Sequence, residues 1–297
     1  MRVLYPTDGR PPAVAAAELL TSLVDRRNVQ VTVLYIDEYG NQLVADAVAA
    51  EVLDQALESI RAAEIDAEPK RSAGSRATGG GVKHAIEREL AGGGYGLVVV
   101  GAGNTGRLGS LILGGVSTFV VHHSMVPTLV VHRSPIEGRD RLRLVVGTDG
   151  SAAAELSVDT LIAVASTQRC NVFVRSVVEP QTAPPPGLQG FATVPSDESE
   201  RMLTEQGQDA DRYVSAALER LTRAGFQCDG DVVRSQAEVA LLDAVRDRDA
   251  DLVVVGTRGR GRIAGIALGS VSAHLVRTAP ATLVTQRPDG SALGPSG

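Results

Sequence analysis

The feature that most constrains this chain is that its sequence repeats. The segment at residues 3–9 reads Val-Leu-Tyr-Pro-Thr-Asp-Gly and returns at residues 144–150 as Leu-Val-Val-Gly-Thr-Asp-Gly. Three further segments return in the same order, from residues 97–101, 113–117 and 127–130 to residues 252–256, 268–272 and 280–284. The spacing between copies is far longer than the roughly 50 residues of the longest solenoid repeats. The sequence therefore predicts one domain in two copies, at residues 1–134 and residues 141–287.

Each half alternates between short apolar strands and helices. Strands are predicted at residues 2–7, 29–37, 96–101 and 127–132, and then at residues 142–148, 171–179, 227–234, 251–256 and 281–286. Helices are predicted at residues 12–26, 44–65, 80–91 and from about 114, and then at residues 152–166, 199–224, 237–248 and from about 270. Continuous apolar strands between helices indicate a parallel sheet covered on both faces. With right-handed crossovers, the prediction is an α/β fold of two tandem, Rossmann-like, doubly wound domains with five-stranded parallel sheets.

The remaining segments carry weaker signals. Residues 68–74 contain a proline, three charged residues and three small residues, so we expect a short edge strand there. Residues 132–140 are predicted to join the two domains, and the proline-rich residues 180–198 to form a long loop. The end of the chain, from about residue 288, is expected to be disordered.

Composition argues against several classes of partner. The formal net charge is −6 and no basic stripe or tail is present, which argues against nucleic acid and against an anionic membrane surface. The N-terminus enters a strand without a charged leader, and no apolar run approaches the ~18 residues of a membrane span. Cys170 and Cys228 are too few for a disulfide framework, so we expect a cytoplasmic protein.

The candidate ligand site lies where the winding direction of each sheet reverses. Ligands of open parallel sheets bind beyond the carboxyl ends of the strands at this point. In the second half, Gly256 and Gly259 follow a strand, and nine residues later Gly269 and Ser270 open a helix. Glycines let the backbone approach a phosphate, and a helix N-terminus supplies free N–H groups with a partial positive charge. Hydroxyls of Ser270 and Ser272 would add donors, and the sequence predicts a phosphate site here.

An aspartate follows the first strand of each half, Asp8 in the first and Asp149 in the second. In the predicted sheet, each would lie across the switch point from the glycine-rich turn. It could accept hydrogen bonds from ribose hydroxyls or an adenine amine. It could equally be the N-cap of the following helix, since aspartate caps well. Both interpretations stay open on the sequence alone.

Together, these residues resemble a known family. The first-strand aspartate, the spacing Gly-x2-Gly-x9-Gly-Ser and the closing strand of the Pro-x-Leu-Val-Val type are similar to those of tandem universal stress proteins of the ATP-binding type. The resemblance covers nearly the whole chain, twice. It implies an adenine nucleotide alpha hydrolase-like fold, pairing of the domains through their last strands, and ATP, with or without Mg²⁺, as the ligand. It also implies a nucleotide-responsive regulator of the stress response with little or no catalysis.

The resemblance further implies which residues bind the nucleotide. In the second half they are Thr148, Asp149, Val177, Gly256, Gly259, Gly269, Ser270, Val271 and Ser272. In the first half they are Pro6, Thr7, Asp8, Ile36, Gly101, Gly114, Gly115, Val116 and Ser117. Val177 and Ile36 would contact adenine, and the glycines and serines would hold ribose and phosphates.

The first half departs from the family pattern at two positions. Asn104 stands where the second half has Gly259, and Gly115 stands where it has Ser270. An asparagine at positive φ costs on the order of 1 kcal/mol, and a lost hydroxyl–phosphate bond costs roughly 1.5–3 kcal/mol. We therefore predict that the first site binds ATP more weakly than the second, by about 2–4 kcal/mol, but is functional.

Other residues are less informative. Arg258, Arg260 and Arg262 could meet phosphate oxygens or form a solvated face. The histidines lack the spacing of metal ligands, so no metal site and no catalytic residue is predicted. The two cysteines are interpreted as ordinary core or near-surface thiols.

Two alternative functions stay open. One is a slow ATPase, or another nucleotide-hydrolysing enzyme of the same layered fold, because a held Mg-ATP can hydrolyse by positioning alone. ATP pyrophosphatases and adenylyltransferases resemble it in architecture, but they carry Ser-Gly-Gly-x-Asp-Ser or His-x-Gly-His after the first strand, where this chain has Thr-Asp-Gly. The other is a dimerisation module that has lost its ligand. The sequence names no protein partner and leaves open whether the tandem chain forms a homodimer.

Overall fold

The structure is a computed structural model of the whole chain. It describes residues 1–37, 42–74, 81–103, 113–135, 138–179, 197–257 and 268–285. The predicted loop at residues 180–198 and the end of the chain from residue 288 therefore lie wholly or mostly outside the described residues, and the predicted linker at residues 132–140 is described in part.

The first half forms five strands and four helices in strict alternation. The strands are β1 (Arg2–Pro6), β2 (Gln30–Asp37), β3 (Asp66–Ala73), β4 (Leu97–Gly101) and β5 (Thr128–Val131). The helices are α1 (Pro11–Leu23), α2 (Gln42–Ala62), α3 (Gly81–Gly93) and α4 (Gly115–His123). Two prolines open α1, where the missing N–H groups cost nothing.

The second half repeats this order. Its strands are β6 (Leu142–Gly147), β7 (Cys170–Val178), β8 (Gln227–Arg234), β9 (Leu252–Gly256) and β10 (Ala281–Thr285). Its helices are α5 (Ala152–Val164), α6 (Asp197–Arg223), α7 (Ala237–Asp247) and α8 (Ser270–Thr278). The predicted elements and the tandem duplication are thus confirmed, and most element boundaries agree within two or three residues.

All ten strands belong to one sheet, in the order β3-β2-β1-β4-β5-β10-β9-β6-β7-β8. Within each half every pair is parallel, whereas β5 and β10 pair antiparallel, with Leu129 opposite Leu283 and Val130 opposite Thr282. The implied pairing of the two domains through their last strands is therefore confirmed. Because β5 and β10 run in opposite directions, the strands of the two halves end on opposite sides of the continuous sheet. We call the side on which the strands of one half end its carboxyl edge, and the opposite side its amino edge.

The prediction for the third strand was partly wrong. The strand β3 does lie at an edge, but it is not short: it pairs with β2 at eight positions, from Gln30–Asp66 to Asp37–Ala73. Pro69 is tolerated because β3 has a neighbour on one side only, so a missing donor on the other side breaks no ladder bond. Its solvent-facing charged side chains hid the strand from a pattern search.

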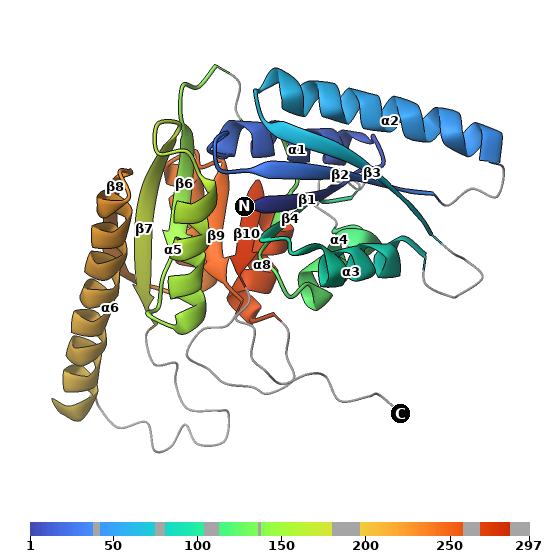
Figure 1. Cartoon of the computed structure of the whole chain (residues 1–297). Helices are drawn as coiled ribbons and strands as arrows, with labels where there is room; N and C mark the ends of the chain where they lie inside the picture. Colours follow the sequence, from blue (N-terminus) through green and yellow to red (C-terminus); the bar gives the residue numbers. More distant parts are fainter. Residues whose placement is uncertain are drawn as a thin grey trace, which may run out of the picture.

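Helices cover both faces of the sheet (Figure 1). On one face, α1, α2, α5 and α6 bury one apolar core that runs through both halves and includes Leu20, Leu129, Leu161 and Leu283. On the other face, α3 and α4 cover the first half and α7 and α8 the second. The core under α3 and α4 extends into the second half at Val276 and Val284, and a further core lies under α7 and α8. In the described part of the chain, no helix combines the length and the apolar character that a membrane crossing requires.

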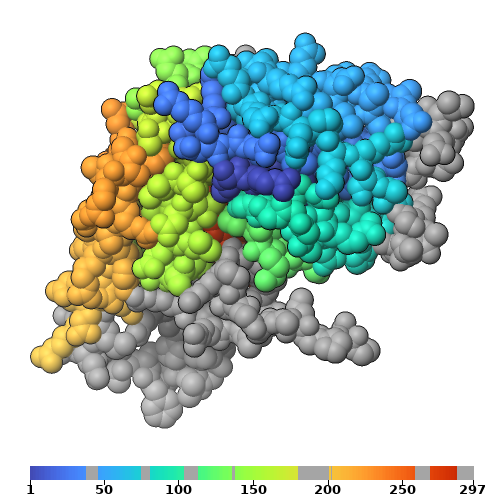
Figure 2. All heavy atoms as spheres, viewed as in Figure 1, coloured from blue at the N-terminus to red at the C-terminus, as the bar shows by residue number. Residues whose placement is uncertain are grey.

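The ends of α1 and α5 add a second contact between the halves. Val24 and Ala165, directly after these helices, form an antiparallel bridge. The Asp25 N–H donates to the Val164 carbonyl at 3.0 Å, and the Ser166 N–H donates to the Leu23 carbonyl at 2.8 Å. This reciprocal pair follows the same pseudo-twofold relation as β5 and β10, and Figure 2 shows the two halves lying directly against each other.

We predict that the two halves unfold together. Replacing the fully buried Leu283 by alanine at the β5–β10 pair should lower the free energy of unfolding by ~2–5 kcal/mol, because it leaves a cavity in the shared core. Urea unfolding followed by circular dichroism and by hydrogen exchange in each half measures this. Val14→Ala on the exposed face of α1 is the control and should change little. An exchange pattern in which only the second half opens would contradict the prediction.

Candidate functional site

The switch point of each half lies between its first and fourth strands. In the first half, β1 is flanked by β2 and β4, and in the second half β6 is flanked by β7 and β9. The chain winds outward in both directions from this place, so the turns after the first and fourth strands diverge onto opposite faces. The structure therefore places the turn after the first strand beside the described start of the turn after the fourth strand, at the carboxyl edge.

The turn after the first strand has the same geometry in both halves. The N–H of Thr7 donates to the Leu34 carbonyl at 2.9 Å, and the N–H of Thr148 donates to the Arg175 carbonyl at 3.0 Å. These bonds extend the ladder with the second strand by one residue. The hydroxyl oxygen of each threonine then accepts the N–H of the glycine two residues later, at 3.2 Å from Gly9 and 3.4 Å in the second half.

The two aspartates are not helix caps. The N-cap residues of α1 and α5 are Arg10 and Ser151, and the Ser151 hydroxyl accepts from the Ala154 N–H. Asp8 Oδ1 instead accepts the N–H of Arg10 at 3.1 Å, and Asp149 Oδ1 accepts the N–H of Ser151 at 3.0 Å. The capping interpretation is thus wrong. A glycine with positive φ, Gly9 or Gly150, separates each aspartate from the N-cap residue of the helix. Each carboxylate stands at the edge of the sheet, and Asp8 is largely exposed.

The fourth strand ends in a glycine that permits close packing. A Cβ at Gly101 would lie 2.2 Å from the Pro12 carbonyl oxygen, and one at Gly256 would lie 2.7 Å from the Ala153 carbonyl carbon. Only glycine therefore lets the first turns of α1 and α5 rest on the ends of β4 and β9. These contacts hold the first-strand turn next to the fourth-strand turn.

The helices α4 and α8 begin at the same edge. Their N-cap residues, Gly114 and Gly269, have extended backbones and no side chain to satisfy the first N–H groups. The earliest intrahelical bonds are donated by Thr118 and Ala273. Each helix thus presents the N–H groups of its first three residues without intrahelical acceptors, as helix starts do. These residues are Gly115, Val116 and Ser117 in α4, and Ser270, Val271 and Ser272 in α8.

The two inner serines fix these helix starts. The Ser117 hydroxyl is buried and donates to the Gly101 carbonyl at 2.7 Å. The Ser272 hydroxyl is also buried and lies 3.1 Å from the carbonyl oxygens of Thr257 and Gly269. Each of these hydroxyls uses its one hydrogen in a bond to a backbone carbonyl, and the serines thereby tie the helix to the end of the fourth strand. Ser270 and Gly115, by contrast, are exposed. The donors available to a ligand here are chiefly backbone N–H groups.

The remaining predicted residues occupy the same edge or lie outside the described part. Ile36 is buried and Val177 half-buried at the ends of β2 and β7, and Pro6 is half-buried at the end of β1. Asn104 and Gly259, and the three arginines that follow Thr257, lie outside the described residues.

An ion-paired cluster at the end of β2 was missed by sequence reasoning. Arg71 of β3 bridges the carboxylates of Asp37 and Asp46, which raise the pKa of its guanidinium. Among the described residues, Asp37 Oδ1 is a buried oxygen without a hydrogen-bond partner. Nothing in the sequence marked this cluster, because an acidic residue at the end of a strand usually faces solvent.

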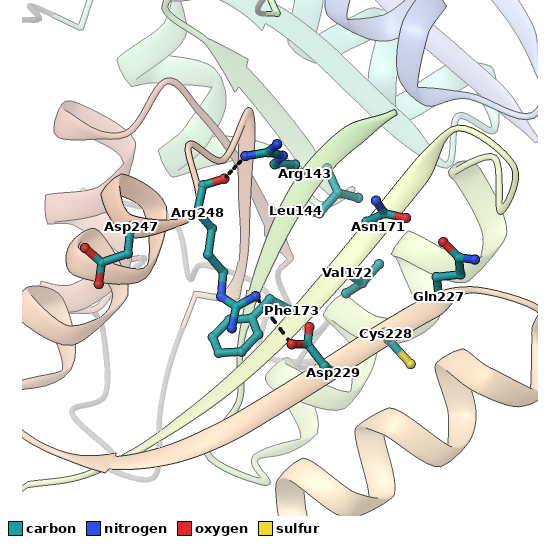
Figure 3. A pocket seen from close by; sticks show the side chains of 10 residues that line it. All are labelled: Arg143, Leu144, Asn171, Val172, Phe173, Gln227, Cys228, Asp229, Asp247 and Arg248. Atoms are coloured by element: carbon teal, nitrogen blue, oxygen red, sulfur yellow. Dashed lines mark hydrogen bonds and ion pairs between the residues drawn. The ribbon is translucent and has the colours of Figure 1, made fainter. Parts of the chain in front are cut away.

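A cavity of about 530 Å³ lies at the opposite edge of the second half. Its walls come from the amino ends of β6, β7 and β8 and the end of α7 (Figure 3). The Arg248 guanidinium lies over the Phe173 ring, 3.2 Å from its centroid, and is 3.4 Å from Asp229. The Arg143 guanidinium donates to the Arg248 carbonyl. In the first half, Tyr95 lies under Arg2, at the sequence position where the second half has Ala250.

Groups of metal-ligating side chains are absent from the described residues. The His132 Nε2 lies 2.6 Å from the Val276 carbonyl, and burial lowers the pKa of this histidine. Tyr5 is buried and donates to the Ala13 carbonyl at 2.6 Å, and burial raises its pKa to about 12. The buried phenol therefore keeps its proton and anchors the start of α1 rather than serving as an acid or base.

Comparison with known sequences identifies the family. The sequence model of the universal stress protein family matches residues 1–132 and matches again at residues 141–286. The chain belongs to the universal stress protein family. The sequence resemblance is confirmed at this level, and the duplicated domain is that family's domain in tandem.

Individual relatives agree with this assignment. A universal stress protein of Mycobacterium tuberculosis is 32% identical over 197 residues, which cover 64% of this chain and 61% of the relative. One of Mycolicibacterium smegmatis is 31% identical over 196 residues, which cover 65% and 62%. The matched segments thus span less than two thirds of the length of these relatives.

Solved structures show the same fold. A universal stress protein of Archaeoglobus fulgidus superimposes with a TM-score of 0.64 at 20% identity, over 96% of this chain and 98% of the other. A Pseudomonas aeruginosa protein described as functionally unknown gives 0.63 at 15% identity, over 96% and 92%.

We predict that Gly150, in the turn after the first strand of the second half, is required for the stability of the fold. Gly150 has φ +70°, and a Cβ there would lie 2.3 Å from the Tyr213 ring. Gly150→Ala should therefore cost about 1 kcal/mol of backbone strain and a further ~1–3 kcal/mol of steric overlap. Gly225→Ala is the matched control, since φ is +97° but the nearest atom is 3.8 Å away. Thermal unfolding compares them, and equal losses would contradict the steric account.

Proposed function

We propose that this chain binds ATP at the carboxyl edge of each half and acts as a nucleotide-responsive regulatory protein with little or no catalysis. One observation carries the proposal most strongly. In both halves a helix start with three N–H groups free of intrahelical acceptors is tied by a buried serine to the fourth strand, beside a Thr-Asp-Gly turn. Such a start attracts phosphate through its N–H groups and its partial positive charge.

The residues present fit a nucleotide. In the first half, a Cβ at Gly103 would lie 3.0 Å from the Gly114 Cα, and a Cβ at Gly114 would lie 3.1 Å from the Gly103 Cα. The two backbone segments therefore approach within reach of one phosphate chain only because neither carries a side chain. Asp8 and Asp149, at the neighbouring turns, are placed to accept bonds from ribose hydroxyls or an adenine amine. Ile36 and Val177 supply apolar surface for the base.

The proposed regulation follows from binding. ATP shifts the chain between two states only to the extent that it binds one of them more tightly. A magnesium ion would arrive with the nucleotide, because Mg²⁺ is usually held by phosphate oxygens and one or two carboxylates. Asp8 and Asp149, in the turn after the first strand of each half, are the carboxylates that we assign to this role. A protein partner would then distinguish the loaded from the empty chain.

The composition of bound nucleotide tests this function. Mass analysis of what the purified chain releases on heat denaturation should find ATP. ADP or AMP released from a chain loaded with ATP would indicate turnover and favour the slow ATPase alternative. A chain that neither releases nucleotide nor binds added ATP at either half would contradict the proposal and favour a dimerisation module.

We predict that the second site binds ATP more tightly. Ser270→Asp and Gly115→Asp each place a carboxylate at an exposed helix start, where it stabilises the helix but repels phosphate. Titration calorimetry of Ser270→Asp reports the first site, and that of Gly115→Asp reports the second. The second should bind roughly 30- to 1,000-fold more tightly, because Asn104 and Gly115 weaken the first. A tighter first site would overturn this ranking.

A further inference from the structure

A lysine stands beside the helix start of the first site. Lys83 lies in the first turn of α3, and its Nζ is 3.8 Å from the place that a Cβ at Gly115 would occupy. The same ammonium lies 5.9 Å from the centroid of the Phe119 ring on α4. Because Gly115 has no side chain, the space between this ammonium and the first turn of α4 is open.

This position is electrostatically unfavourable for a cation. The N-terminus of a helix carries a partial positive charge, and Lys83 lies at two of them, its own in α3 and that of α4. The first turn of α3 holds no acidic residue. No described carboxylate forms an ion pair with Lys83, whereas Lys70 of the same half pairs with Glu89 at 2.7 Å. Three positive elements thus converge at one place, which favours an anion there.

The second half has the opposite charge at the equivalent position. The helices α3 and α7 align through their buried pairs, Ala85 and Ile86 with Ala240 and Leu241. This register matches Lys83 with Glu238, which lies in the first turn of α7. In addition, Glu179 Oε1 accepts the N–H of Ala237 at the start of α7, at 3.1 Å. The first turn of the helix beside the proposed phosphate site therefore holds a basic residue in the first half and an acidic residue in the second.

We propose that Lys83 contacts the phosphates of the nucleotide in the first site and makes that site discriminate by phosphate charge, which the second site does to a smaller degree. The inference rests on the proposed nucleotide site and adds to it a specificity-determining residue. It means that the first site, which lacks the hydroxyl of Ser270, has gained an ammonium instead. The proposal concerns the ratio of ATP affinity to adenosine affinity within one site, so it does not depend on which of the two sites binds ATP more tightly.

The test compares ATP with adenosine at each site of the full chain. The backbone amide signals of Gly115 and Ser270 in a nitrogen-15 NMR titration report the two sites separately, without disabling either. The variants are Lys83→Gln and, as a control for net charge on the same helix, Arg88→Gln, which is also exposed. Thermal unfolding without nucleotide is measured for each.

We expect Lys83→Gln to weaken ATP binding at Gly115 about tenfold, the lower end for a bond to a charged group. Adenosine binding there and ATP binding at Ser270 should not change. The melting temperature without nucleotide should stay the same or rise, because an unfavourable charge is removed. Arg88→Gln should leave the ratio of ATP to adenosine affinity unchanged.

Two results would overturn the inference and are distinguishable. If ATP binds to the first site but Lys83→Gln leaves its ratio of ATP to adenosine affinity unchanged, Lys83 has no role in recognition, while the nucleotide site itself stands. If neither ligand shifts the Gly115 amide of the unmodified chain, the proposed first site fails and the inference fails with it.

Discussion

The close packing of α1 on the end of β4, and of α5 on the end of β9, holds each candidate site together. Both contacts require a glycine, because a Cβ at Gly101 or Gly256 would overlap the backbone of the helix. With the helix in place, the turn after the first strand is fixed next to the turn after the fourth. The buried serines then fix the starts of α4 and α8 to the same strand end. The turn after the first strand and the helix start after the fourth strand are thus held at the same strand end in each half.

The antiparallel pair of β5 and β10 determines how the two sites are related. It joins two five-stranded sheets into one sheet and reverses the strand direction between the halves. The two carboxyl edges therefore face away from each other, and one nucleotide cannot bridge them. Buried cores cross this pair on both faces of the sheet, so any coupling between the two sites has a packed route through either face. On the proposed function, a tandem chain built in this way would bind nucleotide at two separate places.

The fold could be predicted from the sequence because the signals were local and duplicated. Apolar strands, glycine turns and their repetition sufficed for the order of the elements, whereas the pairing of the last strands was implied by the family resemblance alone. The strand β3 was underestimated, because an edge strand with a charged exposed face lacks the pattern of a buried one. The sequence left open whether the aspartates cap the helices, because positive φ at Gly150 is a property of the folded turn that the residue order does not reveal.

Candidate residues could be named from the sequence only where they lie close together in the chain. Spacing marked the glycine turn and helix start of the second half and the aspartate after each first strand, and the family resemblance implied the rest. Lys83 and Glu238 could not be named, since their importance depends on how α3 and α7 pack beside the next helix. The cavity at the amino edge likewise is formed by β6, β7, β8 and the end of α7, which lie far apart in the chain. Such features depend on how elements that are far apart in the chain pack together, and a single sequence does not reveal that packing.

A structure of the chain with a non-hydrolysable ATP analogue tests the central claim most directly. The account predicts a triphosphate at the start of α8, within hydrogen-bond distance of the Ser270 and Val271 N–H groups, and a second at the start of α4 beside Lys83. The claim would be contradicted by a nucleotide in the cavity between Arg143 and Arg248, or by none at either carboxyl edge at saturating concentration.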